Sequence, residues 1–63
     1  MCQSHAYLVE ANGQETLVME DVSVLKPKGD TIVLIGMFGE QKEIKARIKE
    51  LQLTEHRILL EKS

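Results

Sequence analysis

The chain carries its one thiol at the second position, where Cys2 directly follows Met1. The α-amine of Met1, the backbone nitrogen of Cys2 and the thiolate can close fused five-membered rings around a divalent ion. Nitrogen and sulfur donors of this kind suit a metal that accepts square-planar geometry, such as nickel or copper. One N-terminus supplies only half of such a site, so two copies around a two-fold axis would complete it. The alternative, which stays open at this point, is an unpaired thiol without a role.

The other potential metal donors are few. A closed structural zinc site uses four Cys or His ligands at characteristic spacings, and this chain has only His5 and His56 beside its single cysteine. Strand alternation would send His5 to the face opposite Cys2, and His56 falls in a predicted turn. We therefore expect both histidines to be ordinary surface groups. The Met1 thioether is soft and suits Cu(I) better than nickel(II).

Length and composition limit the functional classes. With 63 residues the chain is expected to form one domain over residues 1–63, near the size at which dimerisation helps a small core. The net charge is −2 and the aromatic residues are only Tyr7 and Phe38, which argues against nucleic-acid binding. The longest apolar run, residues 32–35, is far shorter than the ~20 residues that cross a membrane. A single cysteine and the absence of a leader-like start predict a soluble, cytoplasmic protein.

Short strands account for the first two thirds of the chain. β-branched and aromatic residues predict strands over residues 6–10 and 15–19, and Asn12-Gly13 predicts a two-residue hairpin turn that sets Val9 opposite Thr16. Glu20-Asp21 interrupts the pattern before a strand over residues 22–24, and residues 26–30 indicate a turn. Residues 31–37 are almost continuously apolar and should form the central strand of the core. The glycines on either side of Met37-Phe38 indicate a sharp turn.

The segment from Glu43 to Leu53 is compatible with a helix or a strand. Its apolar residues have helical spacing in a run rich in Glu, Lys and Arg, yet they also alternate, with a phase change at Lys49-Glu50 that a β-bulge would explain. Residues 54–57 then predict a turn and residues 58–60 a last strand. Five to six short strands joined by tight turns indicate an all-β fold, a small, strongly bent antiparallel sheet or barrel.

A basic stripe offers a second functional hypothesis. The positive residues between Lys42 and Lys49 could meet RNA phosphates, although the acidic residues among them favour a solvated strand face. The members of the stripe are Lys42, Lys45, Arg47 and Lys49. Catalysis is not expected, because a Cys-His nucleophile needs an orienting partner and an anion-binding pocket that so short a chain does not indicate.

Several short motifs, in the same order over the whole chain, resemble the small CooT family. These motifs are Met1-Cys2, Ala6-Tyr7-Leu8, Met19-Glu20-Asp21-Val22, Phe38-Gly39-Glu40, Ile48-Lys49-Glu50-Leu51 and His56-Arg57-Ile58. The namesake of the family is a nickel-binding accessory protein in the maturation of carbon monoxide dehydrogenase.

The resemblance implies a fold, an assembly and a ligand. It implies an SH3-like β-barrel, a homodimer, and one nickel(II) bound through the cysteine after the initiator methionine, which is Cys2 here. It also favours strand over helix for residues 43–53. The expected function is a nickel metallochaperone or nickel-storage protein that serves a nickel enzyme or its maturation factors. The alternative is a small barrel that binds RNA or another protein through Lys42 to Lys49.

Overall fold

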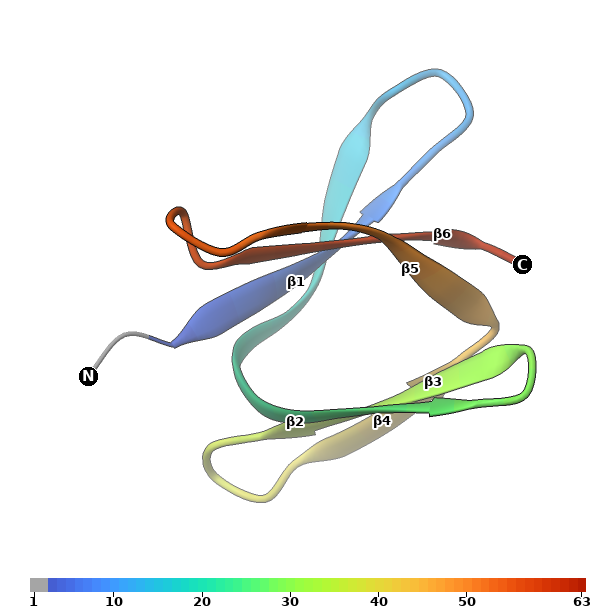
Figure 1. Ribbon diagram of the computed structural model, residues 1–63. Helices are drawn as coiled ribbons and strands as arrows, with labels where there is room; N and C mark the ends of the chain where they lie inside the picture. The colour runs from blue at the N-terminus through green and yellow to red at the C-terminus, as the bar shows by residue number, and fades with distance from the viewer. Residues whose placement is uncertain (1–2) are drawn as a thin grey trace.

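The computed structural model describes residues 3–63, which form a single bent β-sheet (Figure 1). The strands are β1 (Ser4–Val9), β2 (Glu15–Lys28), β3 (Thr31–Gly36), β4 (Gln41–Ile44), β5 (Ala46–Gln52) and β6 (Arg57–Lys62). The expected all-β fold is therefore confirmed. No helix in this part of the chain is long and apolar enough to cross a membrane.

The sheet is rolled into a small barrel. Its strand order is β4-β3-β2-β1-β6-β5, so β4 and β5 occupy opposite edges although only Lys45 separates them in the chain. This link requires the sheet to bend until its two edge strands come together at Lys45, as Figure 1 shows. The pairing of β1 with β6 is parallel, whereas the other pairings are antiparallel. The parallel pair places the start of β6 beside the start of β1.

The first hairpin differs from its predicted register by one residue. Val9 pairs with Glu15 rather than with Thr16, because the loop has three residues instead of two. The amide of Gly13 donates to the Glu10 carbonyl at 2.8 Å, and Gly13 has φ +90°. This is the combination of a type I turn and a glycine bulge that three-residue hairpins commonly use.

The second strand corrects a further expectation. Residues predicted to form two strands and a broad turn make one strand of 14 residues, and only Gly29 and Asp30 remain in the turn. The strand bends sharply at Asp21, so its first part pairs with β1 and its last part with β3. Pro27 lies in the part of β2 that pairs with β3 and not with β1. Its missing N–H therefore interrupts no hydrogen-bond ladder on the β1 side of the strand.

The ambiguous segment is extended, not helical, and it is divided. β4 ends at Ile44 and β5 begins at Ala46, with a bend at Lys45 that carries the chain from one sheet edge to the other. The expected bulge is present, because the β5–β6 register shifts between Ile48 and Glu50. The phase change in the sequence therefore marked a real irregularity of the strand.

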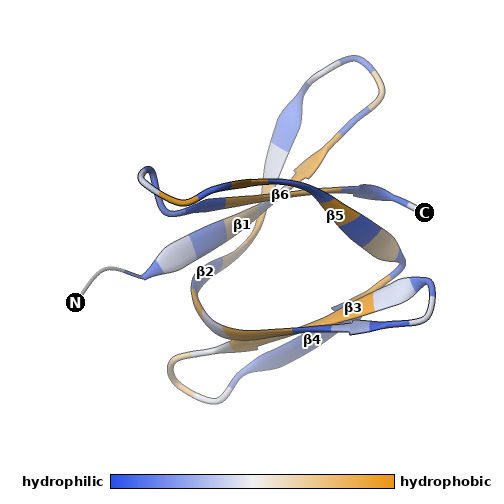
Figure 2. Ribbon diagram, in the orientation of Figure 1, coloured by the Kyte–Doolittle hydropathy of each residue, from blue (hydrophilic) through white to orange (hydrophobic). Residues whose placement is uncertain are grey.

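The core lies inside the barrel and is built mainly on β3. Ile32, Leu34 and Leu60 have the largest fully buried side chains, and Ala6 and Ala46 allow close packing of neighbouring strands. Figure 2 shows the hydrophobic run along β3. Burial of each large side chain stabilises the fold by about 1.5–3 kcal/mol. This small core holds the strands whose ends form the candidate site.

Candidate metal site at the N-terminal end of the barrel

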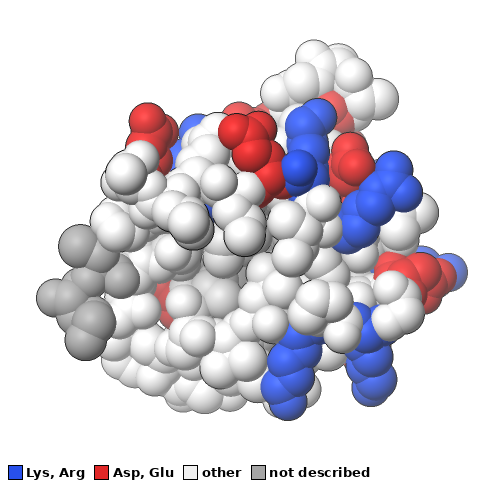
Figure 3. Space-filling model, viewed as in Figure 1, with Lys and Arg blue, Asp and Glu red and all other residues white. Residues whose placement is uncertain are grey.

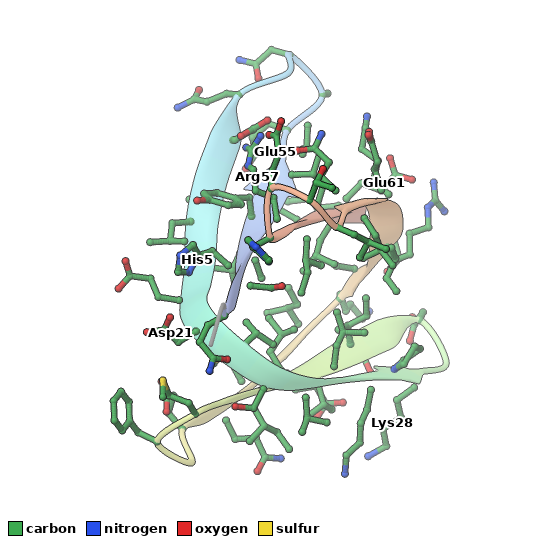
Figure 4. All side chains as sticks on the ribbon, turned by 60° about the vertical axis from the view of Figure 1, so that its left-hand side comes forward. His5, Asp21, Lys28, Glu55, Arg57 and Glu61 are labelled. Carbon is green, nitrogen blue, oxygen red and sulfur yellow. The ribbon has the colours of Figure 1, made fainter. Side chains whose placement is uncertain are left out.

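The predicted ligands Met1 and Cys2 lie outside the described residues. What the structure shows is the surface from which β1 begins, which we call the N-terminal end of the barrel. The bend of β2, the β3–β4 turn and the β5–β6 turn all reach this end, as Figures 1 and 4 show. The contacts among these segments fix the place at which β1 begins.

Three hydrogen bonds join the four segments at this end. The His5 amide donates to the His56 carbonyl at 2.9 Å, which attaches β1 to the β5–β6 turn. The Asp21 amide donates to Nδ1 of His5 at 3.2 Å, which attaches the bend of β2 to β1. The Met37 amide donates to the Asp21 carbonyl at 2.9 Å and adds the β3–β4 turn. His5 and Asp21 are therefore the centre of a connected hydrogen-bond network, in which the His5 imidazole is the one side chain that takes part.

The bend at Asp21 explains why an imidazole is needed there. Asp21 has φ +53°, in the left-handed region that Asp tolerates better than most residues. The β1–β2 register is irregular between Ser4 and Ala6, opposite this bend, so the Asp21 amide points away from the regular ladder. A partly buried amide without an acceptor would cost about 1–3 kcal/mol, and Nδ1 of His5 satisfies it.

This hydrogen bond excludes His5 as a ligand in the observed arrangement. Because Nδ1 accepts the Asp21 amide, the neutral imidazole must carry its proton on Nε2. A metal-bound histidine needs a free lone pair on one nitrogen, while its other nitrogen usually donates. Neither nitrogen of His5 meets that requirement here. In this arrangement the Nδ1 lone pair of His5 is used by the Asp21 amide.

His56 lies at the same end as His5. It occupies the last position of the β5–β6 turn with φ +57°, and its side chain is half-buried rather than freely solvated. Its backbone contribution is the carbonyl that accepts the His5 amide. Within residues 3–63, no three His, Cys, Asp or Glu side chains are grouped closely enough to hold a metal ion.

An apolar rim flanks the start of β1, and the sequence analysis did not identify it. Phe38 is 83% exposed and Met37 is 47% exposed on the β3–β4 turn, while Leu53 is 75% exposed on the β5–β6 turn. In the space-filling view the left-hand side is mostly white with a few acidic atoms, whereas most charged side chains lie over the upper, right-hand and lower parts (Figure 3). The sequence feature that could have predicted this exposed residue is the position of Phe38 between Gly36 and Gly39 in a turn.

The basic stripe, Lys42 to Lys49, is not a continuous free surface. Lys42 extends across the barrel to donate to the Val18 carbonyl at 3.1 Å. Arg47 forms an ion pair with Glu61, with Nε 2.8 Å from the carboxylate. Two of its four cations therefore already have partners within the chain, and no observation on these strands favours phosphate binding.

The electrostatics give no sign of an acid-base centre. The Arg47 hydrogen bond holds the pKa of Glu61 below its usual value, but this pair lies on the exposed outer face of β5 and β6. Residues 3–63 contain no fully buried polar or charged side chain. The region from which β1 begins is thus the end of a small β-barrel, with exposed apolar side chains on two of its turns.

Comparisons with known proteins agree with this description. The sequence profile of the family "CO dehydrogenase accessory protein CooT" matches residues 1–61. An uncharacterized protein of Methanocaldococcus jannaschii, MJ1551, is 41% identical over 61 residues, which cover 97% of this chain and 98% of that protein. A crystal structure from Carboxydothermus hydrogenoformans, provisionally described as CooT, superposes with a TM-score of 0.89 at 42% identity and 98% coverage of both chains.

The chain therefore belongs to the CooT family. The family is described as one of CO dehydrogenase accessory proteins, which agrees with the expected accessory rather than catalytic role. The resemblance that the short motifs indicated is confirmed over nearly the whole chain.

Proposed function

We propose that this protein is a nickel(II) metallochaperone or nickel-storage protein that serves the maturation of CO dehydrogenase. One nickel ion is held between two copies of the chain through the thiolate of Cys2, with the amine of Met1 as a further donor. Membership in a family of CO dehydrogenase accessory proteins supports the role, and the N/S donor set supports the metal.

The observation that carries the proposal is the position of the start of β1. Cys2 precedes His5 by three residues, and His5 is fixed at the end of the barrel that the apolar rim flanks. A second copy that packs against Met37, Phe38 and Leu53 would bring its own N-terminus to the same place. The apolar side chains of the rim suit such a contact, because a two-fold axis places like residues near one another.

A site at the chain start is also appropriate for delivery. An ion that must be passed on leaves by ligand exchange, which a closed four-residue cage hinders. The thiol must lose its proton to bind the metal, so nickel affinity increases with pH. Retention and release of the ion therefore depend on the access of competing ligands to the metal and on protonation of the Cys2 thiol.

The test is nickel titration followed by mass determination under native conditions. The wild-type protein is expected to bind one nickel per dimer, and Cys2→Ser is expected to lose this binding while remaining folded. His56→Ala is the matched control, because it removes an imidazole from the same end of the barrel and should keep the stoichiometry. One tight nickel per dimer in the Cys2→Ser variant would refute the proposal.

A further inference from the structure

We propose that two copies of the chain join reciprocally, with Phe38 of each copy packed against Ile48 and Leu51 of the other along an open seam of the barrel. The inference rests on the proposed function for the presence of two copies, and it specifies which surfaces they share. It concerns residues 3–63 alone, and it can be tested without nickel.

The open seam is the line along which the rolled sheet does not close. β4 and β5 are its two edge strands, and within residues 3–63 no strand pairing joins them. They are linked through Lys45 and diverge toward the N-terminal end of the barrel, where β4 begins and β5 ends (Figure 1). The seam is therefore widest beside the β3–β4 and β5–β6 turns.

Two apolar side chains of β5 are directed into the barrel but are only partly covered at the seam. Ile48 pairs with Leu60, and Leu51 pairs with Ile58. Residues directly opposite in an antiparallel ladder share a face of the sheet, and Leu60 and Ile58 pack in the core. Ile48 and Leu51 nevertheless stay 38% and 50% exposed, because β5 has a neighbouring strand on one side only. These two side chains form the apolar lining of the seam.

The β3–β4 turn presents Phe38 outward on a braced backbone. The Phe38 amide donates to Oε1 of Glu40 at 3.2 Å, and the Gly39 amide donates to the Gly36 carbonyl at 3.0 Å. The Glu40 carboxyl group lies over Gly36, where a Cβ atom would collide with it. The phenylalanine side chain is 83% exposed on this turn. An aromatic side chain held in place before binding loses little entropy in the contact, which is typical of an interface anchor.

A second copy of the chain is the occupant that these features favour. The protruding side chain of Phe38 and the wide end of the seam lie at the same end of the barrel. A two-fold axis beside that end therefore sets each Phe38 against the lining of the other copy. If the two Phe38 side chains met only each other, the lining would stay exposed to water.

The apolar area at this end matches what a small dimer needs. With 83% exposure, Phe38 can bury roughly 150 Å² and cover a similar area of the lining. Two such contacts bury about 600 Å², half of the ~1,200 Å² of the smallest standard interfaces. Met37 and Leu53, which are 47% and 75% exposed at the same end, supply further apolar area. A contact between the two Phe38 side chains alone would bury much less.

Disulfide trapping in a Cys2→Ser background tests the reciprocal contact directly. Phe38→Cys and Leu51→Cys are made in separate proteins, one of which carries an isotope label, and the two are mixed without metal and oxidised. We expect the cross-linked product to join the two different variants in more than the random share, because each new thiol faces the other position across the axis. Leu17→Cys mixed with Leu51→Cys is the matched control and should not cross-link, because Leu17 lies opposite Tyr7 on the first hairpin.

The other products have defined meanings. Cross-linking of Phe38→Cys only with itself would overturn the inference, because like residues would then meet on the axis. Absence of any cross-link would overturn it as well. Nickel titration of the wild-type protein is independent of these results. Proteins that cross-link as expected while the wild type binds no nickel would refute the proposed function and leave the contact standing.

A double-mutant cycle, measured as dimer dissociation constants by sedimentation velocity, is the energetic test. Leu51→Ser should weaken the dimer about tenfold, the factor expected for covering a half-exposed leucine. In the Phe38→Ser background the same change should have little further effect, because the side chain that packs on Leu51 is already absent. Additive effects of the two substitutions, or a dimer that Leu51→Ser does not weaken, would overturn the reciprocal contact.

Discussion

Replacement of Phe38 by serine tests whether the apolar rim is the contact between two copies of the chain. Phe38 is 83% exposed within one protomer, so its removal should leave the fold of that protomer almost unchanged. Surface substitutions of this kind usually alter the free energy of unfolding by no more than about 0.5 kcal/mol. If a second copy covers the side chain, its loss appears in the dimer dissociation constant instead.

The expected change in the dimer dissociation constant follows from the exposure of Phe38 in one protomer. Full burial of a phenylalanine side chain stabilises by about 1.5–3 kcal/mol. With 83% of the side chain available, each Phe38 can contribute about 2 kcal/mol, and a two-fold interface counts it twice. A total of ~4 kcal/mol corresponds to roughly a thousandfold in dissociation constant. The entropy cost of ordering side chains at the interface lowers this factor. We therefore expect the dimer dissociation constant to increase by between about a hundredfold and a thousandfold.

Sedimentation velocity over a range of concentrations, with nickel present, measures this constant. Leu17→Ser is the matched control, because Leu17 is an apolar residue that is 48% exposed on β2 opposite Tyr7, away from the N-terminal end. The control should dimerise like the wild type. A Phe38→Ser protein that dimerises with unchanged affinity would refute the assignment of the rim as the interface.

Two further predictions concern the barrel itself. Leu34→Ala removes a fully buried side chain of β3 and should lower the free energy of unfolding by about 2–5 kcal/mol in urea titrations; a loss below about 1 kcal/mol would contradict the described core. Arg47→Gln removes the hydrogen bond that lowers the pKa of Glu61, so that pKa should rise toward its usual value in an NMR titration. A carboxyl group whose pKa is lowered in the folded state stabilises the fold fully above its unfolded-state pKa. The contribution of Arg47 to the free energy of unfolding should therefore vanish as the pH falls through the folded-state pKa of Glu61. A Glu61 titration curve that is the same in the variant and the wild type would show that the pair does not form in solution.

Local chemistry made much of the fold predictable. The β3 strand followed from continuous apolarity, and the β3–β4 turn followed from its glycines, of which Gly39 has φ +88°. The slip in alternation near Lys49 corresponded to a bulge in β5. Each of these features depends on neighbours in the chain, which is the information that a single sequence contains.

Features set by distant contacts were mispredicted or missed. The acidic pair Glu20-Asp21 suggested the end of a strand, but β2 continues because an imidazole from β1 and an amide from the β3–β4 turn stabilise the bend at Asp21. The parallel pairing of β1 with β6 has no local signature at all. The role of His5 as an acceptor could not be foreseen for the same reason, because it depends on a residue 16 positions away.

The proposed metal site and the proposed interface are thermodynamically inseparable. If one nickel bridges two copies, the factor by which nickel strengthens the dimer must equal the factor by which dimerisation strengthens nickel binding. A substitution at Phe38, which has no metal-binding atom, should therefore lower the apparent nickel affinity at low protein concentration. The loss should disappear at concentrations where the variant is again dimeric, because mass action restores the shared site. A release mechanism follows: any partner that competes for the apolar rim would separate the two thiolates and free the ion without touching a ligand.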